Sequence, residues 1–278
     1  MTAVPAEHTA DRTIDISQTQ QTPFMRLVSV ELRKMWDTRA GLWLLAVTGG
    51  LLVVALGIAL LVVALNDDVN LSANEFSQIM VVPVSLLVPV LAIQSITSEW
   101  SQRTGLVSFA LEPHRMRVVA AKLVTVMVLA LATIVLAVVV GAVGTLLAAA
   151  ITGNDVVWDI EAGQFAWVVA NQLAYFVMAF AFGLVLLSTP AAIAVYYIVA
   201  LLLPVMVYST LYAFFDWARD VIPWIDLGFA MAPYMGQDMG EGVSTSSTTL
   251  MQVVVSAVIW VVVPLVIGLR RVARAELK

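Results

Sequence analysis

The sequence VVAAKLVTVMVLALATIVLAVVVGAVGTLLAAAI, residues 118–151, contains one charged side chain, Lys122, near its start, where the ammonium can snorkel to the headgroups. A helix needs about 20 mostly apolar residues to cross a hydrocarbon core of about 30 Å. This stretch can therefore cross at a tilt and still protrude. The whole chain is 61% hydrophobic and 12% charged, against about 25% charged residues in a soluble domain. We therefore expect a helical membrane protein.

Five other segments are long and apolar enough to cross a membrane. The fourth and fifth of the six are separated only by Ser188 to Pro190. Because proline suits the first turn of a helix, this break predicts a tight hairpin of two helices. The predicted fold class is all-α, a polytopic membrane protein whose six transmembrane helices within 41–269 lie at about 41–65, 79–97, 118–151, 165–187, 190–213 and 250–269.

The positive charges lie on one side of this arrangement. Every Lys and Arg except Arg219 falls in a segment on the side of the N-terminus. Because an excess of Lys and Arg marks cytoplasmic segments, we expect both termini in the cytosol and the protein in the bacterial plasma (inner) membrane. Residues 1–22 lack the apolar core of a secretory signal and predict a disordered cytosolic tail. Residues 270–278 predict a basic cytosolic tail.

The composition argues against several kinds of site. The chain has no cysteine and two histidines, so we expect no metal site. The spans show no arrangement of catalytic residues, so we do not expect an enzyme. The chain also lacks a GxxxxGK[ST] phosphate loop. We therefore expect no bound cofactor, and any active transport must draw its energy from another polypeptide. The expected partner is the lipid bilayer and not nucleic acid.

Few polar side chains remain inside the spans. Gln94, Asn171 and Gln172 are amides, and Pro204 should kink the fifth span because it removes a helical hydrogen bond. One interpretation is that these four residues lie along a substrate path. The other is structural: the amides join neighbouring helices by hydrogen bonds, and the proline serves ordinary packing.

Residues 23–40 predict an amphipathic helix at the inner membrane interface, before the first span. Val30 and Glu31 lie on the wrong faces for this pattern. The helix either only anchors the first span or also contacts a cytosolic partner. Its interfacial residues are Arg26, Arg33, Lys34 and Trp36.

The stretch SEWSQRTGLVSFALEPHRMRVV, residues 98–119, joins the second and third spans in the cytosol. A short helix is expected over 103–111, ended by Glu112 and Pro113, because a residue before proline avoids the helical region. Its apolar tip with a charged rim is typical of a protein contact. The alternative is a loop that touches only water and headgroups.

The longer run ITSEWSQRTGLVSFALEPHRMRVVAAKL, residues 96–123, resembles the corresponding segment of ABC-2 type ABC-transporter permeases. In that family an acidic residue ends the second span, a Gly-Thr turn and an apolar helix follow, and Pro-x-Arg precedes a Lys that opens the third span. Here Thr104 and Gly105 stand in the reverse order. The resemblance implies a coupling helix that docks on an ATPase, with the contact residues Glu99, Arg103, Thr104, Gly105, Leu106, Phe109, Leu111, Pro113 and Arg115.

The function that this resemblance implies is that of the permease subunit of an ATP-driven exporter. Two copies of a separate ATPase would bind ATP and Mg, and a second permease copy or homologue would complete the complex. The mostly apolar spans suit a hydrophobic or amphiphilic substrate, such as a drug, a peptide or a lipid-linked molecule. The alternative is a non-transport sensor or immunity protein that binds through the segment 214–249. There we expect short interfacial helices and a flexible stretch over 240–249.

Overall fold

A computed structural model describes residues 22–66, 69–101, 115–237, 239 and 245–274, with the backbone alone for 99–101. Every regular element within these ranges is helical. Six helical segments among them are long and apolar enough to cross a membrane. The predicted helical class and the predicted number of helices able to cross a membrane are thereby confirmed.

The first three crossing segments are α2 (Arg39–Leu65), α3 (Ala73–Ser101) and α5 (Arg115–Thr152), and they follow the shorter helix α1 (Phe24–Asp37). Each crossing helix extends beyond the predicted apolar run at one or both ends. Backbone hydrogen bonding continues into the polar flanks, so hydrophobicity alone places helix ends only approximately.

The hairpin between the fourth and fifth crossings is confirmed. α6 (Ala162–Leu186) is followed by Leu187, which has a left-handed φ of 51° and donates its N–H to the carbonyl of Gly183 at 2.9 Å. A left-handed residue after the last turn ends many helices because it turns the chain away from the helix axis. α7 (Thr189–Tyr197) starts two residues later, with Pro190 in its first turn.

The fifth crossing changes helix type near its middle. η1 (Ile198–Tyr208), a π-helix, follows α7 and leads into α8 (Ser209–Phe214). Pro204 lies inside η1 and cannot donate a backbone hydrogen bond. π-helical turns are rare and often occur at functional sites. No residue of η1 is buried.

Three short helices follow, as the sequence predicts for the 214–249 segment. They are α9 (Asp216–Ile225), α10 (Leu227–Met231) and the 3₁₀ turn η2 (Ala232–Met235). Asp226 caps α10, because its carboxylate accepts the N–H of Phe229 at 2.9 Å. Burial raises the pKa of Asp226 above its ordinary value.

The sixth crossing consists of α11 (Ser247–Ala257), η3 (Val258–Val262), which is also π-helical, and α12 (Val263–Arg274). It begins inside the stretch 240–249 that was predicted to be flexible, so that prediction is wrong for the last three residues. The reason is a capping box: Ser246 accepts the N–H of Thr249, and Thr249 accepts the N–H of Ser246.

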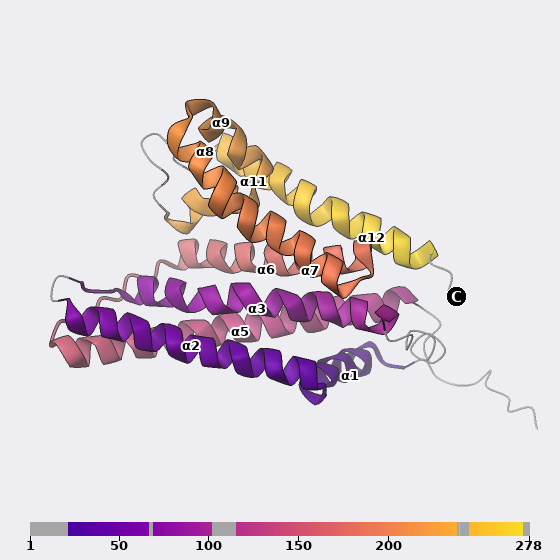
Figure 1. Cartoon of the computed structure of the whole chain (residues 1–278), viewed down its shortest axis with the longest axis horizontal. Coiled ribbons are helices and arrows are strands. Elements are labelled where there is room, and N and C mark those ends of the chain that lie inside the picture. Colours follow the sequence, from indigo (N-terminus) through magenta and orange to yellow (C-terminus); the bar gives the residue numbers. More distant parts are fainter. Residues whose placement is uncertain (1–21, 67–68, 102–114, 238, 240–244, 275–278) are drawn as a thin grey trace, which may run out of the picture.

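α3 lies at the centre of the helix arrangement and contacts α2, α5, α6 and α7, while α12 packs on α6. Figure 1 shows α2, α3, α5 and α6 as near-parallel rods, with α7, α8 and α11–α12 above them. The helix α1, the start of α5 and the last turn of α12 lie at one end of the molecule, hereafter the α1 end. The largest fully buried side chains of the main core cluster are Phe176, Phe180, Met80 and Ile93.

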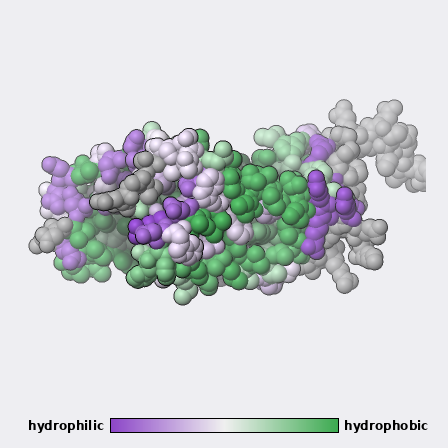
Figure 2. Space-filling view, turned by 90° about the horizontal axis from the view of Figure 1, so that it is seen from above, coloured by the Kyte–Doolittle hydropathy of each residue, from purple (hydrophilic) through white to green (hydrophobic). Residues whose placement is uncertain are grey.

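The surface has an apolar middle. In Figure 2 hydrophobic side chains cover the central part of the visible face, and hydrophilic ones gather toward both ends. Large apolar side chains such as Val53, Leu61 and Val205 are exposed along the crossing helices. A soluble monomer rarely exposes so extensive an apolar surface, and lipid tails are the environment that it fits.

Candidate functional site

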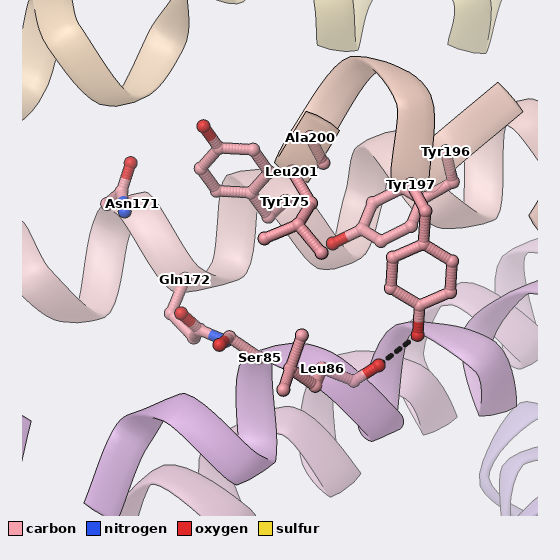
Figure 3. Close-up of a pocket in the computed structure, with 9 residues that line it drawn as sticks. All are labelled: Ser85, Leu86, Asn171, Gln172, Tyr175, Tyr196, Tyr197, Ala200 and Leu201. Atoms are coloured by element: carbon pink, nitrogen blue, oxygen red, sulfur yellow. Dashed lines mark hydrogen bonds between the residues drawn. The ribbon is translucent and has the colours of Figure 1, made fainter. Parts of the chain in front are cut away.

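A cavity of about 220 Å³ lies between three of the crossing helices. Ser85 and Leu86 come from α3, and the remaining walls come from α6 and from the junction of α7 and η1 (Figure 3). Each contributing stretch is near the middle of its own crossing segment, so the cavity is at mid-depth of the apolar band. Its other lining residues are Asn171, Gln172, Tyr175, Tyr196, Tyr197, Ala200 and Leu201.

Two amide groups at this cavity have atoms without a hydrogen-bond partner in the described part of the chain. They are the Oδ1 of Asn171 and the Nε2 of Gln172, and the Gln172 side chain is only 5% exposed. In Figure 3 the Gln172 side chain extends from α6 toward Ser85 of α3. The structural interpretation, in which both amides serve to join helices, does not account for these two atoms.

Tyrosines form the wall opposite the amides. Tyr196 and Tyr197 meet edge to face with ring centroids 5.2 Å apart, and the Tyr197 hydroxyl donates to the carbonyl of Leu86 (Figure 3). That carbonyl lies one turn before Pro89, which interrupts the helical hydrogen bonds of α3. This contact ties α3 to the residue that immediately precedes the π-helix η1.

Tyr175 links the cavity to the 214–249 segment. A side chain at Gly228 would come within 3.0 Å of the Tyr175 hydroxyl oxygen, so the two helices α6 and α10 approach closely at this glycine. Within the described chain, the lining residues include no carboxylate, ammonium or guanidinium group. The cavity therefore offers neutral hydrogen-bonding groups among apolar and aromatic walls.

The structure brings together two of the four predicted path residues. Asn171 and Gln172 line the cavity, whereas Gln94 and Pro204 do not. Gln94 lies farther along α3, and Pro204 lies within η1 beyond Leu201. The tyrosines were missed. Tyr175 follows Asn171 and Gln172 at four and three residues, a spacing that places all three on one helix face, and this signal was present in the sequence.

A second polar cluster joins α1 to α5 at the α1 end. The carboxylate of Glu31 accepts from the ammonium of Lys122 at 2.6 Å and from Lys34 at 2.6 Å. Thr125 of α5 also reaches the carbonyl of Val28 at 3.3 Å. Lys122 is 3% exposed and Glu31 8% exposed. We call these four side chains and the Val28 carbonyl the α1–α5 junction.

The junction corrects two expectations. Lys122 does not extend toward the headgroups, because it is buried against Glu31. Glu31, which broke the amphipathic pattern of residues 23–40, faces the protein because its partner is there. The predicted interfacial residues Arg26, Arg33, Lys34 and Trp36 are all exposed.

Most predicted ATPase contacts fall outside the described residues. These are Arg103, Thr104, Gly105, Leu106, Phe109, Leu111 and Pro113. Glu99 belongs to the last turn of α3, and Arg115 is the first residue of α5. The end of α3 and the start of α5 lie at the α1 end of the molecule (Figure 1).

Within the described ranges, no three His, Cys, Asp or Glu side chains are grouped so that they could hold a metal ion. Neither a protein-family model nor a curated protein matches this chain.

Proposed function

We propose that this chain is the membrane-spanning permease subunit of an ABC-2 type exporter in a bacterial plasma membrane. Its substrate is a hydrophobic or amphiphilic molecule, such as a drug, a peptide or a lipid-linked molecule. Two copies of a separate ATPase bind ATP and Mg, and a second permease copy or homologue completes the complex. The chain itself catalyses no reaction in this proposal.

The cavity at mid-depth is the observation that carries the proposal. An unpartnered polar group in an apolar environment is costly, so membrane proteins pair nearly all of them. The retained amides of Asn171 and Gln172 have no such pairing for two of their atoms. Polar groups that have no partner inside membrane segments are candidates for a functional site, and a substrate path is one such site.

The distribution of charge supports an orientation with the α1 end in the cytosol. The exposed basic side chains Arg26 and Arg33 of α1 lie at this end, and so do Arg270, Arg271 and Arg274 in the last turns of α12 (Figure 1). Cytoplasmic segments are rich in Lys and Arg. Both termini are then cytosolic, and the 103–111 stretch faces the ATPase.

The α1–α5 junction supplies a mechanical route. A push by the ATPase on the 103–111 stretch or on α1 would act on α5 as well, because Glu31 and Lys122 hold the two helices together. α5 packs along α3, and α3 contributes Ser85 and Leu86 to the cavity. ATP-driven movement would thus change the shape of the substrate site.

The test is to isolate the tagged full-length chain from its native membrane in mild detergent and to identify copurifying proteins by mass spectrometry. We expect an ATPase with a phosphate loop to copurify, and we expect the purified complex to hydrolyse ATP only when this ATPase is present. Phe109→Asp should abolish this copurification, because a carboxylate in the apolar tip of the docking helix cannot enter a hydrophobic contact.

The matched control is Phe215→Asp, which makes the same change at an exposed residue between α8 and α9, at the end opposite α1. It should leave copurification intact. An ATPase that stays bound to the Phe109→Asp chain contradicts the docking role. A chain that functions with no ATPase partner, but loses function on changes within 214–249, favours the sensor or immunity alternative.

A further inference from the structure

We infer that the mid-depth cavity binds the uncharged, hydrogen-bonding head of a small amphiphile whose apolar tail extends along η1. The inference rests on the proposed function in one respect: it identifies this amphiphile as the substrate of the exporter. Binding itself is a property of the cavity in this chain.

The head must carry both a donor and an acceptor. The unpartnered Oδ1 of Asn171 accepts a hydrogen bond, and the unpartnered Nε2 of Gln172 donates one. Both amides line the same cavity as the hydroxyls of Ser85 and Tyr196, so its wall presents donors and acceptors together. Amides and hydroxyls combine a donor and an acceptor, whereas esters and ketones offer only acceptors.

The head must also be uncharged. None of the described residues that line the cavity is Asp, Glu, Lys, Arg or His. A charge placed at mid-depth without a counter-charge is far more costly than a neutral polar group. Asp226 is not among the lining residues, and its carboxylate already accepts the N–H of Phe229.

The size of the cavity limits what it can enclose. Pockets for whole drug-sized ligands measure about 300–1,000 Å³, and this one measures about 220 Å³. It therefore encloses one end of a molecule. The rest of the ligand leaves the cavity beside Leu201, which lines the cavity and is 41% exposed.

Apolar side chains continue from Leu201 along η1. Leu202 and Val205 are exposed on that helix, and none of its residues is buried. A hydrocarbon tail that lay there would remain in contact with lipid while the head occupied the cavity. The proposed ligand therefore enters from the bilayer and not from water.

The experiment uses the full chain alone in phosphatidylcholine nanodiscs. The probe is stearamide with a diazirine on its acyl chain, and labelled residues are mapped by mass spectrometry after irradiation. We expect saturable labelling on η1 and on α3 or α6. Excess stearamide should compete. Three other amphiphiles should compete at least tenfold more weakly: octadecyl sulfate, which is anionic, octadecyltrimethylammonium, which is cationic, and methyl stearate, which has no hydrogen-bond donor.

The variant Gln172→Leu should reduce saturable labelling about tenfold, because it removes the donor and keeps the side-chain bulk. Gln252→Leu makes the same change at a buried glutamine of α11 that does not line the cavity, and it should label as the unmodified chain does. Ala200→Phe fills the cavity while both amides remain, so it gives an independent loss of labelling if Gln172→Leu does not fold.

Equal competition by a charged amphiphile, labelling outside the named helices, or full labelling of both Gln172→Leu and Ala200→Phe would overturn the inference. Because no ATPase is present, this result is separate from copurification. If the chain binds stearamide but no ATPase copurifies with it, the cavity is a binding site and the exporter proposal is wrong. If an ATPase copurifies but stearamide does not bind, the exporter proposal stands and this substrate class is wrong.

Discussion

Two polar regions interrupt the apolar interior of this protein, and they differ in how completely their groups are paired. At the α1–α5 junction Glu31 has a cationic partner at 2.6 Å on each of two helices. At the mid-depth cavity the Nε2 of Gln172 and the Oδ1 of Asn171 have none within the described chain. A paired polar cluster fixes two elements together, whereas the unpaired amides are the groups that we propose bind a ligand.

The comparison also separates two ways in which a chain keeps a polar residue in an apolar sequence. Glu31 and Lys122 satisfy each other, so their burial requires no other molecule. Gln172 is 5% exposed and is not satisfied by its neighbours. The first arrangement should stabilise the fold and the second should weaken it, so substitutions at the two sites should have opposite signs.

The largest effect is expected at the junction. Glu31→Gln removes the carboxylate that faces Lys122 and Lys34, and it should lower the free energy of unfolding by about 3 kcal/mol, as breaking a buried ion pair does. Lys122→Met disturbs only one of the two pairs and should cost less. The measurement is the unfolding midpoint in mixed micelles of detergent and SDS, followed by tryptophan fluorescence.

Asp37→Asn provides the control, because it also removes a carboxylate from α1 but at an exposed position. It should change the free energy of unfolding by about 0.5 kcal/mol or less. The double variant Glu31→Gln/Lys122→Met should recover part of the loss, since it removes both charges. Equal destabilisation by Asp37→Asn and Glu31→Gln would mean that the junction is not a stabilising contact.

The opposite sign is expected at the cavity. Gln172→Leu replaces a buried amide that has an unpartnered Nε2 by an apolar side chain of similar size, and it should raise the free energy of unfolding by about 1–2 kcal/mol. Ligand binding should fall in the same variant, which is the usual exchange of stability for function at a binding site.

Thermal unfolding in detergent without ligand would measure this gain, with Gln252→Leu beside it. The side chain of Gln252 is buried, but its amide is not among the fully enclosed groups without a partner, so its replacement should stabilise less. A loss of stability in Gln172→Leu that equals the loss in Glu31→Gln would place both sites in the same structural role.

The sequence predicts the crossing helices because hydrophobic length alone determines them. It predicts that Asn171 and Gln172 are exceptional, since few polar residues lie within the spans. It does not predict that Glu31 meets Lys122, because the partners are 91 residues apart and their contact depends on how α1 lies against α5. The π-helix η1 is also not visible in the apolar pattern of residues 198–208, because both helix types accept the same side chains there.

The smallest effect is expected from a hydroxyl at the junction. Thr125 has one hydroxyl hydrogen and two nearby carbonyl acceptors, Val28 of α1 at 3.3 Å and Ala121 of its own helix at 2.9 Å. The shorter bond is within α5, so the hydroxyl contributes little to holding α1. Thr125→Val, which keeps the shape, should therefore lower the free energy of unfolding by about 0.5–1 kcal/mol.

Thr133→Val is the matched control for this substitution. Thr133 is also buried in α5, but its hydroxyl bonds only carbonyls of its own helix, those of Leu129 and Ala130. If the bond to α1 matters, Thr125→Val should lower the unfolding midpoint slightly more than Thr133→Val does. If Thr125→Val lowers the stability as much as Glu31→Gln does, the Thr125 hydroxyl and not the ion pair is the main contact that holds α1. Equal small losses at the two threonines would leave the Glu31–Lys122 pair as the contact that holds α1 on α5.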